Sequence, residues 1–429
     1  MDQAVTNPSS LNKTISEVEF RKGWVHQPNQ RGTIDIIWSC LLVLFVCIWT
    51  VINLNVPARK DGYWTQVFRK VRWSTLAICA PEILSLFASM QWNGSLQSVR
   101  EMHEMGDKDW SAVHAFFANS GGFMLESTDQ PEFPVRAASI HYLRVNGWIK
   151  PPKITKEEIW DRSKADKFAK GVALTQTAWL LLQCLARVVK GLAVSPLEIF
   201  TLAFVVCTAC TAYFWLNKPQ NVQLPTTIHM DHAIADVLLA AGDAAKDPYI
   251  DTPMDFVERP LWEQWERRPS LLAFGGLDHR PLPREPDDYA QPPPKPTLAL
   301  CMWSLSMVHA GVHVLGWHFP FATTFERILW RVCSLVMLGV MCLGGVIPVI
   351  STRPNFDFRI NLLWIWIRQT QNHRSTIARR WLFDLPVHIA ASLYILARMF
   401  IIFEVFYSLR SLPASSYTCV DWTAIWPHV

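Results

Sequence analysis

The chain has 429 residues, of which 50% are hydrophobic, 18% charged and 12% aromatic, with a formal net charge of +4. The charged share is below the roughly 25% of an average soluble domain, and the deficit falls in blocks of about 20 to 25 residues, long enough to cross a bilayer as helices. These features exclude a soluble single-domain enzyme, a disordered chain and a secreted disulfide scaffold, and the small net charge gives no reason to expect a nucleic-acid partner.

From residue 34 onward the pattern predicts an all-α fold, a polytopic transmembrane helical bundle of about seven spans, with a range of six to eight, and two long polar loops. Met1–Arg31 is polar and lacks the apolar core of a cleavable signal. Tryptophans near the ends of several blocks are typical of interfacial positions. The expected spans cover residues 34–53, 73–92, 171–190, 194–216, 297–317, 328–350 and 381–407.

Seven regions are expected in chain order. Ala112–Leu125 is too short and too rich in glycine to cross, so a re-entrant or interfacial segment is expected there. The regions are a polar N-terminal tail (1–33), two transmembrane helices with a basic loop (34–92), an extramembrane loop with the re-entrant or interfacial segment (93–170), a transmembrane hairpin (171–216), a polar Pro-rich loop (217–296), three transmembrane helices with an interfacial helix at 360–368 (297–407) and a C-terminal tail (408–429).

The orientation in the membrane stays open. The loop between the first two expected spans is basic, which favours a cytoplasmic position by the positive-inside rule. With seven spans, residues 352–380 would lie on the opposite side, and they hold six arginines, so the two indications nearly cancel. The basic residues of the first loop are Arg59, Lys60, Arg69, Lys70 and Arg72.

A family resemblance is carried by GWVHQPNQRGTIDIIWSC (Gly23–Cys40), APEIL (Ala80–Leu84), HAFFANSGGF (His114–Phe123), ITKEEIWDRSKAD (Ile154–Asp166), ARMFIIFEVFYSLRSLP (Ala397–Pro413) and WTAIWPH (Trp422–His428). Together these segments resemble a large, mostly uncharacterised family of multi-pass integral membrane proteins of filamentous fungi. The resemblance covers nearly the whole chain outside the linker around residues 250–295. Members near secondary-metabolite gene clusters imply a pathway context, but the resemblance implies no catalytic residue.

Glu82 is the first candidate site residue, because it follows Pro81 at the middle of the second expected span. A proline leaves a carbonyl of the preceding turn without its helical hydrogen bond, and an opened helix can line a cavity in which a carboxyl acts as a general acid. The alternative is that Glu82 pairs with an arginine of another span. Charged groups at membrane depth are costly and are functional candidates by default.

His309 and His313 lie four residues apart in the fifth expected span and so share one helix face. This is the spacing of a two-histidine metal half-site, but the glutamate of the zinc-protease signature is missing. A third ligand would have to come from His388 or Asp384. We favour the alternative that both histidines bond neighbouring helices, so no metal is expected.

The last expected span carries Asp384, His388 and Arg398 within about 40 degrees of one another around the helix, at 100 degrees per residue. The shared face is expected to point away from lipid. Asp384 would orient the His388 ring for acid/base chemistry, unless it is an interfacial cap. The candidate catalytic residues are therefore Glu82, His309, His313, Asp384, His388 and Arg398.

Other signals are weaker. The pair Cys207 and Cys210 lies inside an apolar block, where packing is favoured over thiol exchange. Arg187 and Glu198 allow an ion pair across the 171–216 hairpin. The sequence lacks a Walker loop, GxGxxG, GxSxG and Asp-rich prenyl-diphosphate motifs, so no organic cofactor is expected.

Three classes of function remain. The leading one is a membrane enzyme without a cofactor that cyclises, isomerises or hydrolyses a lipophilic small molecule by acid/base chemistry. The alternatives are a transporter or channel for a small molecule or ion, and a sensor or scaffold whose loops bind partners. The expected partners are the lipid bilayer and a lipophilic small molecule, in an endomembrane or the plasma membrane.

Overall fold

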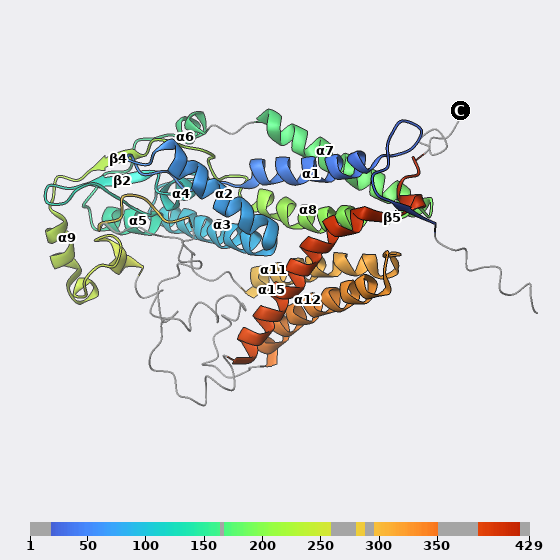
Figure 1. Ribbon diagram of the computed structural model, residues 1–429. Coiled ribbons are helices and arrows are strands. Elements are labelled where there is room, and N and C mark those ends of the chain that lie inside the picture. Colours follow the sequence, from blue (N-terminus) through green and yellow to red (C-terminus); the bar gives the residue numbers. More distant parts are fainter. Residues whose placement is uncertain (1–18, 164–166, 259–279, 288–295, 351–384, 421–429) are drawn as a thin grey trace, which may run out of the picture.

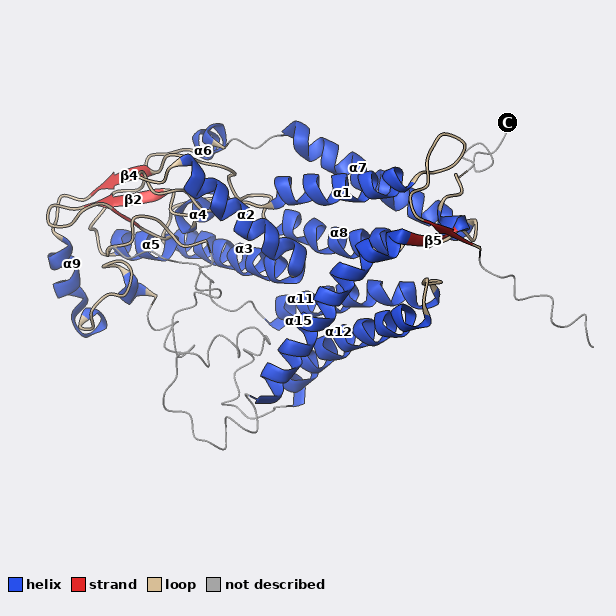
Figure 2. Cartoon of the chain, viewed as in Figure 1, coloured by secondary structure: helices blue, strands red, loops and turns tan. Residues whose placement is uncertain are grey.

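The computed structural model describes residues 19–163, 167–258, 280–287, 296–350 and 385–420. These residues form a bundle of long helices at one end and a smaller unit of short helices and strands at the other (Figure 1 and Figure 2). We call the first part the bundle and the second part, residues 93–163 with 218–258 and 280–287, the mixed unit.

Five helices are long and apolar enough to cross a membrane, which indicates a membrane protein. The bent pair α2–α3 meets the same test when taken as one span, so five or six spans are found among the described residues and the expected seven are not confirmed. The five are α1 (Thr33–Val51), α7 (Lys167–Val189), α8 (Pro196–Phe214), α11 (Pro296–Val312, continued by the 3-10 helix η4, His313–His318) and α15 (Leu385–Tyr407).

Helix α12 (Thr324–Ile350) packs against α11 and α15 and completes the bundle. Its first two turns carry three charged residues close together, Glu326, Arg327 and Arg331. The span expected at 328–350 is therefore a helix that starts earlier, with a charged beginning.

The second expected span, residues 73–92, is wrong as a single helix. Helix α2 (Tyr63–Cys79) ends before Ala80, and α3 (Pro81–Glu104) leaves at 112° to it. Pro81 occupies the first position of α3, where its missing N–H is no loss and its fixed φ suits a helix. A residue before proline avoids the helical region, and Ala80 has φ −150° and ψ 70°. The proline thus starts a new helix instead of opening a continuous one.

The mixed unit is built around a three-stranded sheet in the order β3–β2–β4. Strand β2 (Phe123–Glu126) pairs antiparallel with β3 (Phe133–Pro134) and parallel with β4 (Thr226–His229), with Met124 opposite Thr227. The parallel pair joins two connections that are far apart in the sequence. What was expected to be two separate polar loops is one packed unit.

Short helices cover this sheet. The segment Ala112–Leu125 forms α4 and β2, and most of its apolar side chains are buried within the protein. Its glycines make the turn between them, since Gly121 has φ +77° and a Cβ on Gly122 would lie 2.4 Å from the Phe117 ring. The helices are α4 (Ala112–Asn119), α5 (Ala137–Val145), α6 (Lys156–Arg162) and α9 (Ile234–Ala241), with the 3-10 turns η2 (Gly242–Ala245) and η3 (Asp255–Val257).

The opposite end of the bundle is closed by an antiparallel strand pair, β1 (Phe20–Lys22) with β5 (Ser411–Pro413). Strand β5 lies between the 3-10 turns η6 (Ser408–Arg410) and η7 (Ala414–Ser416). The two outermost parts of the described chain therefore meet beside the ends of α7 and α15 (Figure 1).

A buried ion pair at this end differs from the expected one. Glu198 accepts from Arg31 at 2.5 Å, and its other carboxylate oxygen caps α8 through the Ser195 N–H and hydroxyl. Arg187 instead donates to backbone carbonyls, among them those of Ser415 (2.7 Å) and Ala193 (3.0 Å). The two arginines thus fix the N-terminal and C-terminal segments onto the bundle.

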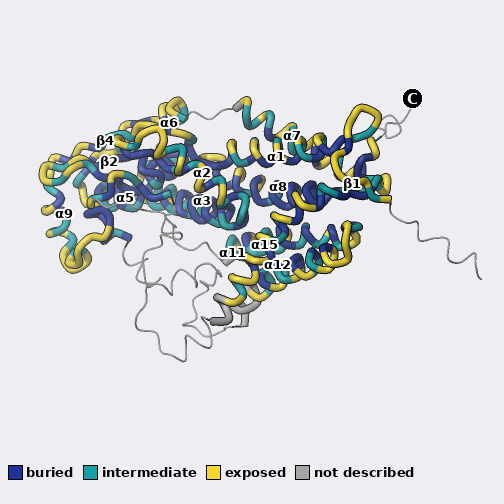
Figure 3. Tube along the Cα trace, viewed as in Figure 1, coloured by how far each residue is buried: buried dark blue, intermediate teal, exposed yellow. Residues whose placement is uncertain are grey.

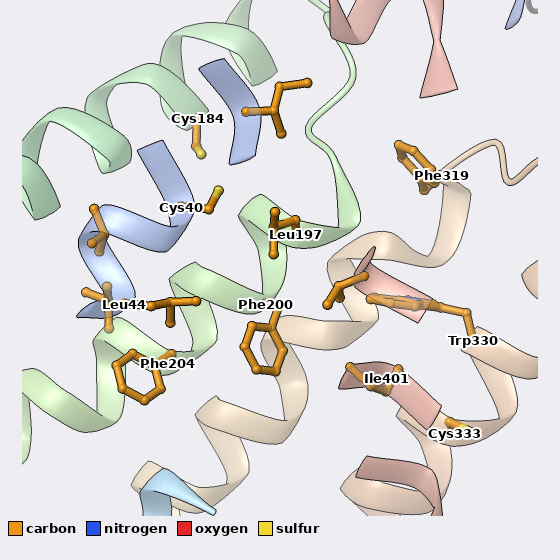
Figure 4. Packing of buried hydrophobic residues seen from close by; sticks show 14 of the residues in the cluster. Cys40, Leu44, Cys184, Leu197, Phe200, Phe204, Phe319, Trp330, Cys333 and Ile401 are labelled. Atoms are coloured by element: carbon orange, nitrogen blue, oxygen red, sulfur yellow. The ribbon is translucent and has the colours of Figure 1, made fainter. Parts of the chain in front are cut away.

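The main apolar core runs through the bundle. Figure 4 shows side chains of α1, α7 and α8 meeting those of α12, α15 and the loop after η4. The outer faces of the bundle helices are also apolar, and Figure 3 shows exposed positions along them. Such an outer surface suits lipid better than water. Exposed examples are Trp38 and Phe45 of α1, Leu181 and Leu185 of α7, and Leu393 and Leu396 of α15.

Lys218 lies in a buried polar junction where α1 and α8 leave the bundle. Its ammonium donates to the carbonyl of Asn53 (2.9 Å), Oδ1 of Asn55 (3.2 Å) and Oε1 of Gln91 (3.0 Å). The Trp215 ring centroid lies 4.8 Å from it. All three donors of the ammonium are satisfied, yet burial lowers the pKa of Lys218 to about 7.

A second junction fixes α2. Arg69 binds Asp287 through two hydrogen bonds, Nε to Oδ2 at 2.9 Å and Nη2 to Oδ1 at 2.6 Å, and also donates to the Asn55 carbonyl. Burial acts to raise the pKa of Asp287, but the Arg69 guanidinium holds it below its ordinary value. The face of α2 that carries Arg69 is therefore turned inward.

We expect stability to rise with pH above neutrality because of Lys218. Its pKa is about 7 in the folded protein and 10.5 ordinarily, so between these values the unfolded chain binds one proton more than the folded one. The free energy of unfolding then increases by about 1.4 kcal/mol per pH unit over this interval. Thermal unfolding of the detergent-solubilised protein across the interval measures the effect.

The matched control is Lys218→Met, which keeps the length of the apolar stem but has no titrating group. In this variant the free energy of unfolding should no longer rise with pH over this interval. If the free energy of unfolding of Lys218→Met rises by the same amount, the effect belongs to other titrating groups.

Candidate functional site

Four of the six expected site residues meet inside the bundle, at the bend between α2 and α3. Glu82 lies in the first turn of α3, His309 in α11, His313 at the start of η4 and Arg398 in α15, and all four side chains are buried. Tyr394, one turn before Arg398, joins them. Three separate parts of the sequence thus supply one polar cluster, which we call the bend cluster.

Arg398 donates hydrogen bonds to the backbone at the bend between α2 and α3. The break after α2 leaves its last carbonyls without helical partners. Arg398 donates from Nε to the carbonyl of Cys79 (3.1 Å) and from Nη2 to that of Ile78 (3.2 Å). Its guanidinium also lies 4.8 Å from the Phe200 ring centroid. The arginine on α15 therefore supplies the donors that the interrupted helix lacks.

The hydrogen-bond partners of the two histidine rings determine which tautomer each ring adopts. Nδ1 of His309 lies 3.0 Å from the Ala203 carbonyl, and Nδ1 of His313 lies 3.1 Å from the carbonyl of His309. A carbonyl only accepts, so both Nδ1 atoms carry the proton. Nε2 of His313 faces Nη1 of Arg398 at 3.2 Å and must accept. His313 is therefore a neutral ring held between α11 and α15.

Glu82 bonds with one oxygen and faces a histidine with the other. Oε1 accepts from the Tyr394 hydroxyl at 2.8 Å. Oε2 lies 3.6 Å from Nε2 of His309, just beyond hydrogen-bonding distance. Neither Oε2 nor Nε2 has another hydrogen-bond partner within the described residues, and both are buried.

This geometry implies a shared proton. An ionised carboxylate oxygen and the unprotonated nitrogen of an imidazole are both acceptors, so they repel one another at this separation. No heavy atom fits between atoms 3.6 Å apart. A single proton on Glu82 or on His309 converts the repulsion into attraction. The pair is thus arranged to hold one proton between a carboxyl and an imidazole.

A metal at the two histidines does not fit this arrangement. Nε2 of His313 accepts from a guanidinium, whose positive charge opposes a second cation there. Among the described residues no group of three or more His, Cys, Asp and Glu side chains is placed to bind a metal ion.

Two expected residues of the last span lie outside this description. Asp384 is outside the described residues, as is the interfacial helix expected at 360–368. His388 falls within the backbone of α15, but its side chain is not among those described. The role expected for the pair stays a prediction.

Tyr394 was not among the expected site residues. A tyrosine in an apolar helix usually indicates an interfacial position, and the hydroxyl gives no further pattern. The available signal was its spacing, because residues four apart share a helix face and Arg398 was already expected to point inward.

Arg398→Met should destabilise the protein strongly. The change keeps much of the apolar stem and leaves the carbonyls of Ile78 and Cys79 without donors, at about 1–3 kcal/mol for each buried unpaired group. Thermal unfolding in detergent measures the loss. Arg327→Met, on the exposed face of α12, is the matched control and should change stability little. Equal melting of both variants would contradict the role of Arg398 at the bend.

Comparison with known proteins gives a family and no function. No curated protein matches the sequence, and no solved structure matches it either. Residues 9–246 and 297–429 match DUF8562, described as a family of unknown function. The unmatched segment between them contains the linker that precedes α11. Because the match covers most of its length, the chain belongs to the DUF8562 family.

Proposed function

We propose that this membrane protein is a cofactor-independent enzyme that uses Glu82 and His309 for acid/base chemistry on a lipophilic small molecule. The observation that carries the proposal is the facing of Glu82 Oε2 and His309 Nε2, both buried and 3.6 Å apart. A carboxyl and an imidazole that share a proton are the two groups most often used as general acid and base.

The surroundings support the assignment of roles. The hydroxyl of Tyr394 fixes one oxygen of Glu82, which leaves the other to exchange the proton. His313 and Arg398 contact each other and the backbone around the pair, so they are positioning residues. The site lies among apolar side chains of the bundle, which suits a lipophilic substrate.

Isomerisation or cyclisation is the reaction class that fits best. Such a reaction needs no second substrate, because a proton given to one atom of the substrate is balanced by a proton taken from another. Glu82 in its acid form gives the first proton, and the resulting carboxylate or the neutral His309 takes the second. A secondary metabolite as substrate is supported by the resemblance to proteins encoded near secondary-metabolite genes.

Glu82→Gln should abolish the reaction without unfolding the protein. The amide oxygen still accepts from Tyr394 and the amide nitrogen donates to His309 Nε2, but no proton is transferred. Loss of a general acid lowers a rate by about a hundred- to ten-thousand-fold. Mass spectrometry of lipid extracts from the native host, with the variant at the natural locus, should show the product missing and its precursor accumulated.

The control is His318→Gln, a polar replacement at an exposed residue at the end of η4. It should leave the extract unchanged, with both variants present in membranes at the wild-type level. A normal product level in Glu82→Gln would dismiss the acid/base assignment.

A transporter is the second candidate, favoured by the bend itself. Interrupted helices line the substrate sites of many transporters, and here α2 and α3 meet beside Glu82 at 112°. A proton-coupled transporter reconstituted in vesicles would acidify their lumen when a pH gradient and host lipid extract are applied, and Glu82→Gln would stop it. Product formation without proton flux favours the enzyme.

A further inference from the structure

The outer face of α2 carries large apolar side chains that nothing in the described chain covers. Tyr63 and Trp64 are each 73% exposed, Phe68 is 71% exposed and Val71 is 56% exposed. Residues 64, 68 and 71 are four and three apart, so they form one stripe along the helix. We call Trp64, Phe68 and Val71, with Tyr63 beside them, the α2 stripe.

The stripe cannot be turned inward by rotating the helix. The opposite face of α2 holds Arg69, bonded twice to Asp287, and the buried ring of Trp73. The end of the helix is held by Arg398 through the Ile78 carbonyl. The ion pair and the bend therefore fix the stripe toward the outside of the molecule.

Neighbouring aromatic residues give the depth of α2 in the membrane. Trp49 lies in the last turn of α1, one of the five apolar helices, and is 53% exposed. The ammonium of Lys70 lies 3.5 Å from its ring centroid. Exposed tryptophans at the ends of spans mark the headgroup level. The middle of α2, at Lys70, thus lies at the level where the bundle meets the mixed unit (Figure 1).

Positive charge accompanies the stripe. Lys60 is exposed in the loop before α2, and Lys70 lies within the helix. In the part of the chain that the structure describes, neither ammonium pairs with a carboxylate. An aromatic stripe flanked by lysines is the pattern of a helix that lies in the membrane interface and attracts anionic headgroups.

We propose that α2 is an interfacial helix that binds anionic phospholipid in the leaflet beside the mixed unit, with the α2 stripe among the acyl chains and Lys60 and Lys70 on the headgroups. The occupant is a lipid and not a second protein, because the apolar stripe and two lysines belong to one short stretch of chain whose Lys70 contacts Trp49 at the end of a span. Acyl chains cover the stripe while phosphate and carboxylate groups reach the ammonium groups.

The experiment uses the full chain in vesicles that contain phosphatidylserine or phosphatidylcholine with a photoactivatable acyl chain. Peptides labelled after illumination are mapped by mass spectrometry. Phosphatidylserine should label residues 60–72 several-fold more than phosphatidylcholine does. Each of Lys60→Gln and Lys70→Gln should lower labelling by phosphatidylserine about fivefold, the factor that corresponds to about 1 kcal/mol per charge near an anionic surface.

Two further variants separate the parts of the proposal. Trp64→Ser with Phe68→Ser should reduce labelling of α2 by both lipids, because the helix loses two apolar side chains that contact the acyl chains. Lys190→Gln changes an exposed lysine at the opposite end of the bundle and should leave the labelling of α2 unchanged. Each variant is used after it elutes as a single species in detergent.

The proposal fails on either of two results. Equal labelling of α2 by the two lipids would show that anionic headgroups are not recognised. Absence of label from both lipids would show that the stripe does not lie in the membrane and would leave a protein partner as its occupant.

Discussion

The arrangement of the bundle depends on how the carbonyl groups at a broken helix are satisfied. Where α2 ends at Cys79, the last carbonyls lie inside the protein and have no partner in their own helix. An unpaired carbonyl in an apolar environment costs about 1–3 kcal/mol, so a break inside the bundle persists only if another element supplies donors. Arg398 supplies them from α15, at 3.1 and 3.2 Å.

This one contact also determines which groups lie beside the bend. Arg398 must approach from α15, so Tyr394, one turn away on the same helix, comes within 2.8 Å of Glu82. The third guanidinium nitrogen reaches His313. The histidines in turn bond carbonyls of α8 and α11, and three helices are thereby held around the start of α3. The polar cluster is therefore a structural joint between these helices.

The sequence predicts the bundle helices well and their connections poorly. An apolar block is a local property, and the block at 34–53 corresponds to α1 (Thr33–Val51) as the one at 194–216 does to α8 (Pro196–Phe214). The block at 73–92 failed because a proline either kinks a helix or begins one, and the choice depends on whether another helix can accept the freed carbonyls. Here the donors come from Arg398, which is more than 300 residues away in the sequence, so the choice cannot be read locally.

In the mixed unit too, local structure can be predicted from the sequence but long-range contacts cannot. In α9, Ile234 and Val237 are buried three residues apart, and a period of 3.6 residues of this kind is visible locally in the sequence. The parallel pairing of β2 with β4 has no local pattern, since each strand is four residues long and its partner lies in the other connection. Glu82, His309, His313 and Arg398, which lie together, were singled out from the sequence because charge is conspicuous in apolar helices. Tyr394, which contacts Glu82, was not, because its hydroxyl is less conspicuous.

The bend cluster places a fixed positive charge beside two facing acceptors. Arg398 carries a fixed positive charge and bonds only carbonyls and a neutral ring, so it favours the negative form of Glu82 in a medium of low dielectric constant. The facing acceptors of Glu82 and His309 have the opposite effect, because only a proton removes their repulsion. The fixed charge and the facing acceptors therefore act on the pair in opposite directions. A pair dominated by either influence would hold its proton permanently or never take it up, and neither would serve acid/base chemistry.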